Sequence, residues 1–161
     1  MIQQTPRSVS RHDSAKAAGA LAAAASLCRE RGAQFTEVRR GLLEALLHAA
    51  QPLGAYELLS RLETALGRKI APPTVYRSLD FLMGQGLVSR IESMNAFVPC
   101  AHPEHPHVCV FFVCEHCGNS LEVENHALER LIARDASALD FEINRRVVEL
   151  QGTCAQCRSA A

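Results

Sequence analysis

The chain has 161 residues, with 17 Lys and Arg, 17 Asp and Glu, and a formal net charge of zero. This length permits one large domain or two small ones, each with a core of its own. Zero net charge by itself argues against a nucleic-acid binder, and seven cysteines, an odd number, argue against a fully disulfide-paired secreted scaffold.

The charge is unevenly distributed along the chain. Residues 1–99 carry 12 Lys and Arg against 8 Asp and Glu, whereas residues 100–161 carry 5 against 9. This asymmetry is compatible with one half that faces a polyanion and another half with a different role. The cysteine content favours a reducing compartment, so we expect a cytoplasmic protein.

The N-terminal region has the outline of a signal peptide, because Arg7, Arg11 and Lys16 precede the stretch "AAGALAAAASL". The middle of this stretch is mostly alanine, which is weakly apolar and the best helix former. We therefore favour a helix behind a loose tail, with residues 1–20 as the tail and the start of that helix. No run of about 18 apolar residues occurs elsewhere, so we expect no contact with a membrane.

Three helices and a hairpin are predicted next. "TEVRRGLLEALLHAA" (36–50) has Thr36 as its N-cap, "GAYELLSRLETALG" (54–67) ends at a glycine, and "APPTVYRSLDFLMGQG" (71–86) begins with prolines that a first turn tolerates. "LVSRIESMNAFVP" (87–99) contains two β-prone pieces around a polar turn. The outward side chains of the third helix would be Tyr76, Arg77 and Asp80.

This order of elements is typical of a winged helix-turn-helix, in which the third helix enters the major groove of DNA. An ordinary small helical domain with a solvated third helix is the alternative. After residue 100 the periodicity changes to strands at "VCVFFVC" (108–114), "SLEVE" (120–124) and "FEINRRVVEL" (141–150), with a helix capped by Asn125 between the last two. The predicted fold class is α+β, with a winged helix at 21–94, a hinge at 95–99 and a small α+β domain at 100–161.

Two Cys-x-x-Cys pairs occur in the second half, "CEHC" at Cys114 and Cys117 and "CAQC" at Cys154 and Cys157. Four thiols suit a tetrahedral zinc ion, which binds sulfur at about 2.3 Å. The strand, helix and strand between the pairs would fold back and bring them together. Because sulfur would fill all four positions, the ion would be structural. A redox dithiol is the alternative, but it leaves the second pair unexplained.

A further set of metal-binding side chains crowds the stretch "CAHPEHPHVC". His-x-His places two imidazoles on one side of an extended chain, where both can reach one ion. A thiol and a carboxylate beside them would favour zinc over iron or manganese. The candidates are Cys100, His102, His105, His107, Cys109 and, further along the chain, Glu122.

Together these motifs resemble the ferric uptake regulator family of metal-sensing transcription repressors, and most closely its zinc uptake regulator branch. The resemblance covers nearly all of residues 20–158 and rests on "PPTVYRSLDFLMGQGLVSRIE", on "CEHCG" with "CAQC", and on "CAHPEHPH". It implies a homodimer with a DNA-binding domain, a hinge and a dimerisation domain. It also implies a repressor of zinc uptake and homeostasis genes that binds a palindromic operator in double-stranded DNA, with zinc as co-repressor.

The resemblance also implies roles for individual residues. Cys114, Cys117, Cys154 and Cys157 would hold structural Zn²⁺, and Cys100, His107 and Glu122 would hold regulatory Zn²⁺. Some relatives have His or Asp at the position of Ser89, so His105, rather than His102, is our choice for the missing fourth ligand. Tyr56 and Arg77 would read bases, whereas Arg39, Arg40, Arg68 and Tyr76 would contact phosphate. An iron or peroxide sensor of the same family, or a zinc-dependent hydrolase, is the alternative function.

Overall fold

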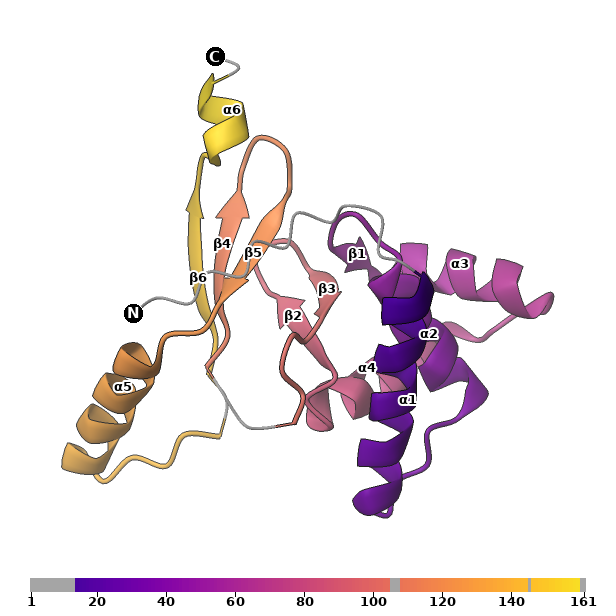
Figure 1. Cartoon of the computed structure of the whole chain (residues 1–161), viewed down its shortest axis with the longest axis horizontal. Coiled ribbons are helices and arrows are strands. Elements are labelled where there is room, and N and C mark those ends of the chain that lie inside the picture. Colours follow the sequence, from indigo (N-terminus) through magenta and orange to yellow (C-terminus); the bar gives the residue numbers. More distant parts are fainter. Residues whose placement is uncertain (1–13, 105–107, 145, 160–161) are drawn as a thin grey trace. The chain divides into compact units, whose positions relative to one another are not determined.

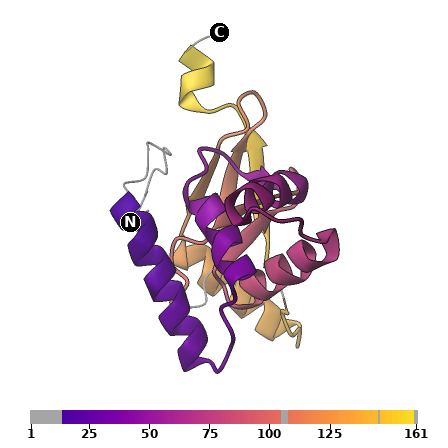
Figure 2. The same cartoon turned by 90° about the vertical axis from the view of Figure 1, so that its right-hand side faces the viewer.

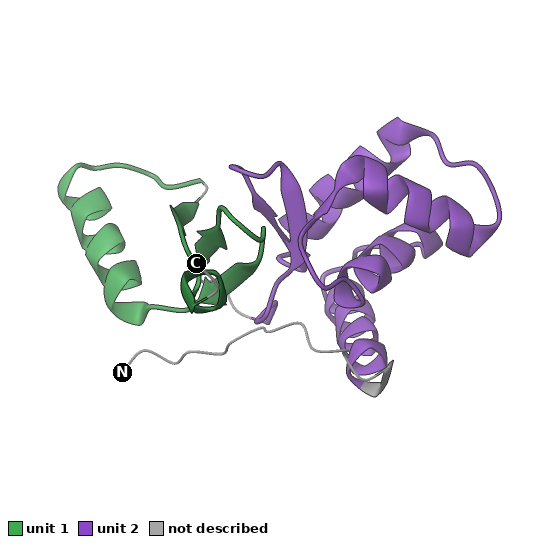
Figure 3. Ribbon diagram, turned by 90° about the horizontal axis from the view of Figure 1, so that it is seen from above, with its two compact units in different colours: residues 1–8, 106–161 green, residues 9–105 purple. Residues whose placement is uncertain are grey.

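The computed structural model describes residues 14–104, 108–144 and 146–159. The chain divides into two compact units, residues 9–105 in one and residues 106–161 in the other (Figure 3). We call them the helical unit and the cysteine unit. Each combines helices with a three-stranded sheet, which confirms the predicted α+β class.

The helical unit contains four helices and a small antiparallel sheet (Figures 1 and 2). The helices are α1 (Ser14–Glu30), α2 (Glu37–Leu47), α3 (Ala55–Leu66) and α4 (Pro72–Gly84). The strands β1 (Leu53–Gly54), β2 (Val88–Ile91) and β3 (Ala96–Pro99) follow the order β1-β3-β2. The Ala-rich stretch is thus the helix α1, and the three further helices and the hairpin are confirmed.

One apolar face of each helix builds the core of the helical unit. The side chains of Leu46 on α2, Leu62 on α3 and Leu79 on α4 are at most 2% exposed. Each such burial contributes roughly 1.5–3 kcal/mol relative to an exposed side chain. The opposite faces of α3 and α4 carry the polar and aromatic side chains, so the core orients these two helices with Tyr56 and Tyr76 outward.

The ends of the helices are defined by local chemistry. Gly67 follows α3 with a φ of 64°, a left-handed conformation that glycine adopts without strain. Thr36 occupies the N-cap of α2 with extended backbone, but its side chain makes no capping hydrogen bond, so that part of the prediction is wrong. Between α3 and α4, Glu63 accepts hydrogen bonds from the Ile70 N–H over 2.9 Å and from Lys69 over 3.0 Å, which holds the connecting loop.

The cysteine unit is built on the sheet order β5-β4-β6. Its elements are β4 (Val110–Cys114), β5 (Ser120–Val123), α5 (His126–Ala138), β6 (Val148–Gly152) and α6 (Ala155–Ser159). β5 is antiparallel to β4, and β6 is parallel to β4 with α5 in the connection. The predicted Asn125 cap is confirmed, because its side chain accepts hydrogen bonds from the N–H groups of Ala127 and Leu128.

The last strand is shorter at its start than the sequence predicts. β6 begins at Val148, which lies opposite Val110, the first residue of β4. β4 offers no earlier ladder positions, so Phe141 and its neighbours have no strand to pair with and Phe141 is 66% exposed. Within the described residues, no helix is both long enough and apolar enough to cross a membrane.

Candidate metal centres and nucleic-acid interface

The four paired cysteines lie at one end of the cysteine unit. Cys114 is the last residue of β4 and Cys117 lies in the turn toward β5, while Cys154 precedes α6 and Cys157 lies within it. The parallel register of β4 and β6 places Cys114 opposite Gly152, two positions before Cys154. Strand pairing therefore brings together two motifs that are far apart in the sequence.

The four sulfur atoms form one cluster, with all of them within 4.8 Å of one another. Cys117 Sγ and Cys154 Sγ lie 3.8 Å apart. In a tetrahedron with zinc–sulfur bonds of about 2.3 Å, neighbouring sulfur atoms are roughly 3.8 Å apart. The donor set and its spacing thus fit a tetrahedral zinc ion.

The backbone around the cluster favours a thiolate at one position. The N–H groups of Cys154 and then Cys117 point to Cys114 Sγ and lower the pKa of this thiol to about 6. Hydrogen bonds with the neighbouring thiols, Cys154 first, raise the pKa of Cys157 to about 12. Four thiolates this close would repel one another, so the four thiols cannot all ionise without a cation among them. A divalent ion supplies the missing positive charge.

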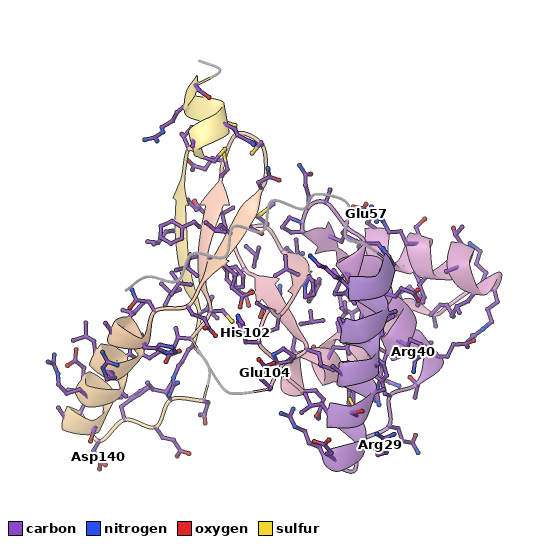
Figure 4. The ribbon with its side chains drawn as sticks, in the orientation of Figure 1. Arg29, Arg40, Glu57, His102, Glu104 and Asp140 are labelled. Atoms are coloured by element: carbon purple, nitrogen blue, oxygen red, sulfur yellow. The ribbon has the colours of Figure 1, made fainter. Side chains whose placement is uncertain are left out.

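The predicted regulatory ligands are only partly within the described residues. Cys100 follows β3 in the helical unit, where its N–H donates to the Leu87 carbonyl over 3.0 Å. Glu122 lies on β5 in the cysteine unit, opposite Phe111. His105 and His107 lie outside the described residues. His102 Nδ1 lies 3.4 Å from the Glu104 carboxylate, and both side chains are labelled in Figure 4.

Cys109 is the candidate that the sequence left without a role. Its Sγ lies within 4.8 Å of a Glu122 carboxylate oxygen, inside the cysteine unit. The only signal in the sequence was strand alternation: Cys109 directly precedes β4, alternation places it on the same side as Phe111, and Phe111 pairs with Glu122. Without the register between β4 and β5, this pairing could not be found.

The predicted base readers, Tyr56 and Arg77, and the predicted phosphate contact Tyr76 lie on the surface of the helical unit. Tyr56, in the first turn of α3, is 76% exposed, and Tyr76 on α4 is 45% exposed. Arg77 is also exposed, one position after Tyr76. The side chains predicted to face outward from the third helix are therefore accessible. Their contact with DNA stays a prediction.

Three of the predicted phosphate contacts have partners within the chain. The Arg39 guanidinium lies 3.4 Å from the centroid of the Phe81 ring and donates to the Gln34 carbonyl, so it joins α2 to α4. Arg40, labelled in Figure 4, lies 5.3 Å from the Phe35 ring centroid. Arg68 pairs with Glu37 over 2.9 Å at the surface. Of these contacts, the one made by Arg39 binds two helices together.

Comparisons with known proteins agree with this architecture. The model of the ferric uptake regulator family matches residues 30–151. The zinc uptake regulation protein of Escherichia coli (strain K12) is 35% identical over 138 residues, which cover 85% of this chain and 80% of that protein.

Two solved structures are also similar. A zinc uptake regulator complexed with zinc and DNA superposes with a TM-score of 0.83 at 33% identity, over 89% of this chain and 96% of the other. The holo form of XcZur gives a TM-score of 0.77 at 38% identity, over 86% and 96%. The chain belongs to the ferric uptake regulator family.

Proposed function

We propose that this protein is a zinc-responsive, DNA-binding transcription repressor that controls genes of zinc uptake and homeostasis. The observation that carries the proposal is its likeness, over nearly the whole chain, to a zinc uptake regulator complexed with zinc and DNA. The family comprises transcription regulators rather than enzymes, and no observation favours a hydrolase or an iron sensor. A regulator of this kind acts where the chromosome is, so we also propose a cytoplasmic location.

The four-cysteine cluster is proposed to hold structural zinc. Cys114, Cys117, Cys154 and Cys157 would fill the coordination sphere, which leaves no position for a substrate. Structural sites of this kind contribute roughly 10–16 kcal/mol of apparent binding free energy, which becomes folding free energy. α5 has no fully buried residue among those described, so the buried apolar side chains of the cysteine unit come from its sheet and the residues next to it, such as Phe111 and Val113.

The regulatory ion is proposed to be held by Cys100, His105, His107 and Glu122. Cys100 belongs to the helical unit and Glu122 to the cysteine unit, so ligation by both would favour arrangements of the units in which these side chains meet. Such an arrangement gains population when zinc is present because it binds the ion better. A shift from 1:99 to 99:1 needs a difference of about 10⁴ in affinity, or about 5.5 kcal/mol.

DNA recognition is proposed to reside on α3 and α4. Arg77 can donate two hydrogen bonds to guanine O6 and N7, a contact that contributes about 1–3 kcal/mol of discrimination between bases. Tyr56, which is 76% exposed, can reach a base edge or a thymine methyl group. Tyr76, Arg39 and Arg40 would contact phosphate and contribute affinity rather than sequence preference.

A homodimer is proposed to form through the cysteine unit. The register places Phe112 between Leu121 and Leu150 on one face of the sheet, and Phe112 and Leu150 are 46% and 47% exposed. A contiguous apolar face of this kind indicates a partner surface. A second copy related by a two-fold axis would cover it and present two α4 helices to a palindromic operator.

The experiment that tests this function begins with DNA selected from a random-sequence pool by the zinc-loaded full chain. Binding to the selected DNA is then measured at buffered free zinc, iron(II) and manganese(II). We expect a palindromic site that is bound tightly with zinc and weakly after mild chelation, with the structural zinc retained. Equal binding with and without added zinc, or a response to iron alone, would contradict the proposal.

A further inference from the structure

Cys109 lies outside the four-cysteine cluster and next to an acidic side chain. Its sulfur atom and a Glu122 carboxylate oxygen are within 4.8 Å of each other. Two ligands of one tetrahedral zinc ion, with bonds of about 2.0–2.3 Å, are roughly 3.5 Å apart. A change of rotamer in either side chain can bring the sulfur and the carboxylate oxygen to this ligand separation, so one ion can bind both.

The backbone on both sides of Cys109 is held in place. The preceding Val108 is 1% exposed, and its N–H donates to Glu129 Oε1 on α5 over 2.8 Å. The following Val110 is 5% exposed and pairs with Val123 on one side and Val148 on the other. The thiol therefore projects from a fixed point, as a metal ligand requires for a defined geometry.

The surroundings of this thiol favour a cation. Strand alternation places Glu122 and Glu149, both opposite Phe111, on the face that carries Cys109. Glu124 lies one pleat beyond Glu122, and its Oε1 is buried without a hydrogen-bond partner in the described part of the chain. Three carboxylates on one sheet face raise the local affinity for a divalent ion, and a thiolate selects zinc over harder ions.

We propose that Cys109, together with Glu122, is a ligand of the regulatory zinc and takes the position otherwise assigned to His105. This inference rests on the proposed function, because it assigns a ligand of the same ion. It gives the regulatory ion a thiolate and a carboxylate that both lie in the cysteine unit. His105 is then dispensable for zinc binding.

The test compares Cys109→Ser with His105→Ala in the full chain, and Cys28→Ala serves as a control cysteine from the core of the helical unit. Second-site zinc affinity is measured by competition with a chelator of known affinity. Cobalt(II) is substituted at the second site, and its thiolate-to-metal charge-transfer absorption is recorded. In the wild type, alkylation of each cysteine is followed by mass spectrometry with and without the second zinc.

We expect Cys109→Ser to weaken the second zinc by at least about 10-fold, since even an outer-sphere change costs that much. It should lower the charge-transfer absorption and retain the structural zinc. His105→Ala and Cys28→Ala should keep the wild-type affinity, and zinc should protect Cys109 from alkylation.

The inference is overturned if Cys109 is alkylated equally fast with and without zinc, or if His105→Ala loses the second zinc while Cys109→Ser keeps it. Either result leaves the proposed function standing, because the wild type still takes up the ion. A wild type that takes up no second zinc contradicts the proposed function and this inference together. The alkylation readout needs no variant, so a misfolded Cys109→Ser protein does not remove the test.

Discussion

The backbone N–H of Cys154 donates a hydrogen bond to Cys114 Sγ over 3.4 Å, although the two residues lie 40 positions apart. Parallel pairing of β4 with β6 creates this contact, because it places Cys114 opposite Gly152. Fold and metal site are therefore interdependent: the sheet assembles the cluster, and a bound ion would tie the two strand ends together.

The first prediction follows from this interdependence. Cys114→Ser removes the thiol with the lowered pKa and leaves three sulfur ligands. We expect loss of the tightly held zinc and of cooperative unfolding of the cysteine unit, since structural zinc sites supply about 10–16 kcal/mol. Metal content and thermal unfolding measure this, with Cys28→Ala as the control cysteine outside both proposed metal sites. Full zinc content with unchanged unfolding would show that the cluster is not structural.

The second prediction concerns the loop between α3 and α4. The Ile70 N–H, followed by Lys69, lowers the pKa of Glu63 below its ordinary value. The ionised carboxylate therefore stabilises the fold above the unfolded-state pKa of about 4.3, and this stabilisation is lost as the pH falls through the folded pKa. Glu63→Gln should be less stable than the wild type near pH 7, and the gap should close in acid. Urea unfolding at a series of pH values measures it, and a constant gap would contradict the assignment.

The third prediction separates base reading from phosphate contact. Arg77→Ala should weaken binding to the selected operator by about 10–100-fold and binding to random DNA much less, because a lost base contact relaxes specificity. Arg40→Ala should weaken both alike and make the salt dependence shallower. Arg39→Ala is a poor comparison, since its guanidinium packs on Phe81 and its loss disturbs the fold. Equal losses on both DNAs would assign Arg77 to phosphate.

The fourth prediction tests the proposed dimer face. Phe112→Asp places a charge on the exposed apolar row beside Leu150, and in a two-fold interface the change occurs twice. We expect the dimer dissociation constant to rise by at least about 10-fold, equivalent to 1.4 kcal/mol. Gln151→Asp, on the opposite face of β6, is the matched control. Sedimentation that shows equal dimer content in both variants would place the interface elsewhere.

Much of the fold could be predicted from the sequence because its signals are local. The spacing of apolar residues specifies which face of each helix is buried, as with Leu42 and Leu46 on α2 and Val75 and Leu79 on α4. These four side chains are at most 2% exposed. The spacing of the two Cys-x-x-Cys pairs likewise predicts a metal site without any knowledge of the fold. In these places local pattern and final structure agree.

The features that could not be predicted from the sequence depend on strand register and on contacts between elements that are far apart in the chain. The pairing of Cys109 with Glu122 requires the alignment of β4 with β5, which no single strand encodes. The start of β6 at Val148 is determined by where β4 begins. The phosphate contact of Arg39 was implied by the family resemblance, and the packing of this side chain on Phe81 arises only when α2 meets α4.

The most direct test of zinc-controlled DNA binding is a zinc-buffered titration of operator binding with Cys100→Ser. This residue lies in the helical unit, outside the four-cysteine cluster, so its loss should spare the structural zinc. We predict a folded dimer with its structural zinc that needs at least about 10-fold more free zinc than the wild type to hold the operator. Metal content and dimer mass are checked in parallel. Operator binding at the same free zinc as the wild type would show that Cys100 senses no metal and would contradict the account.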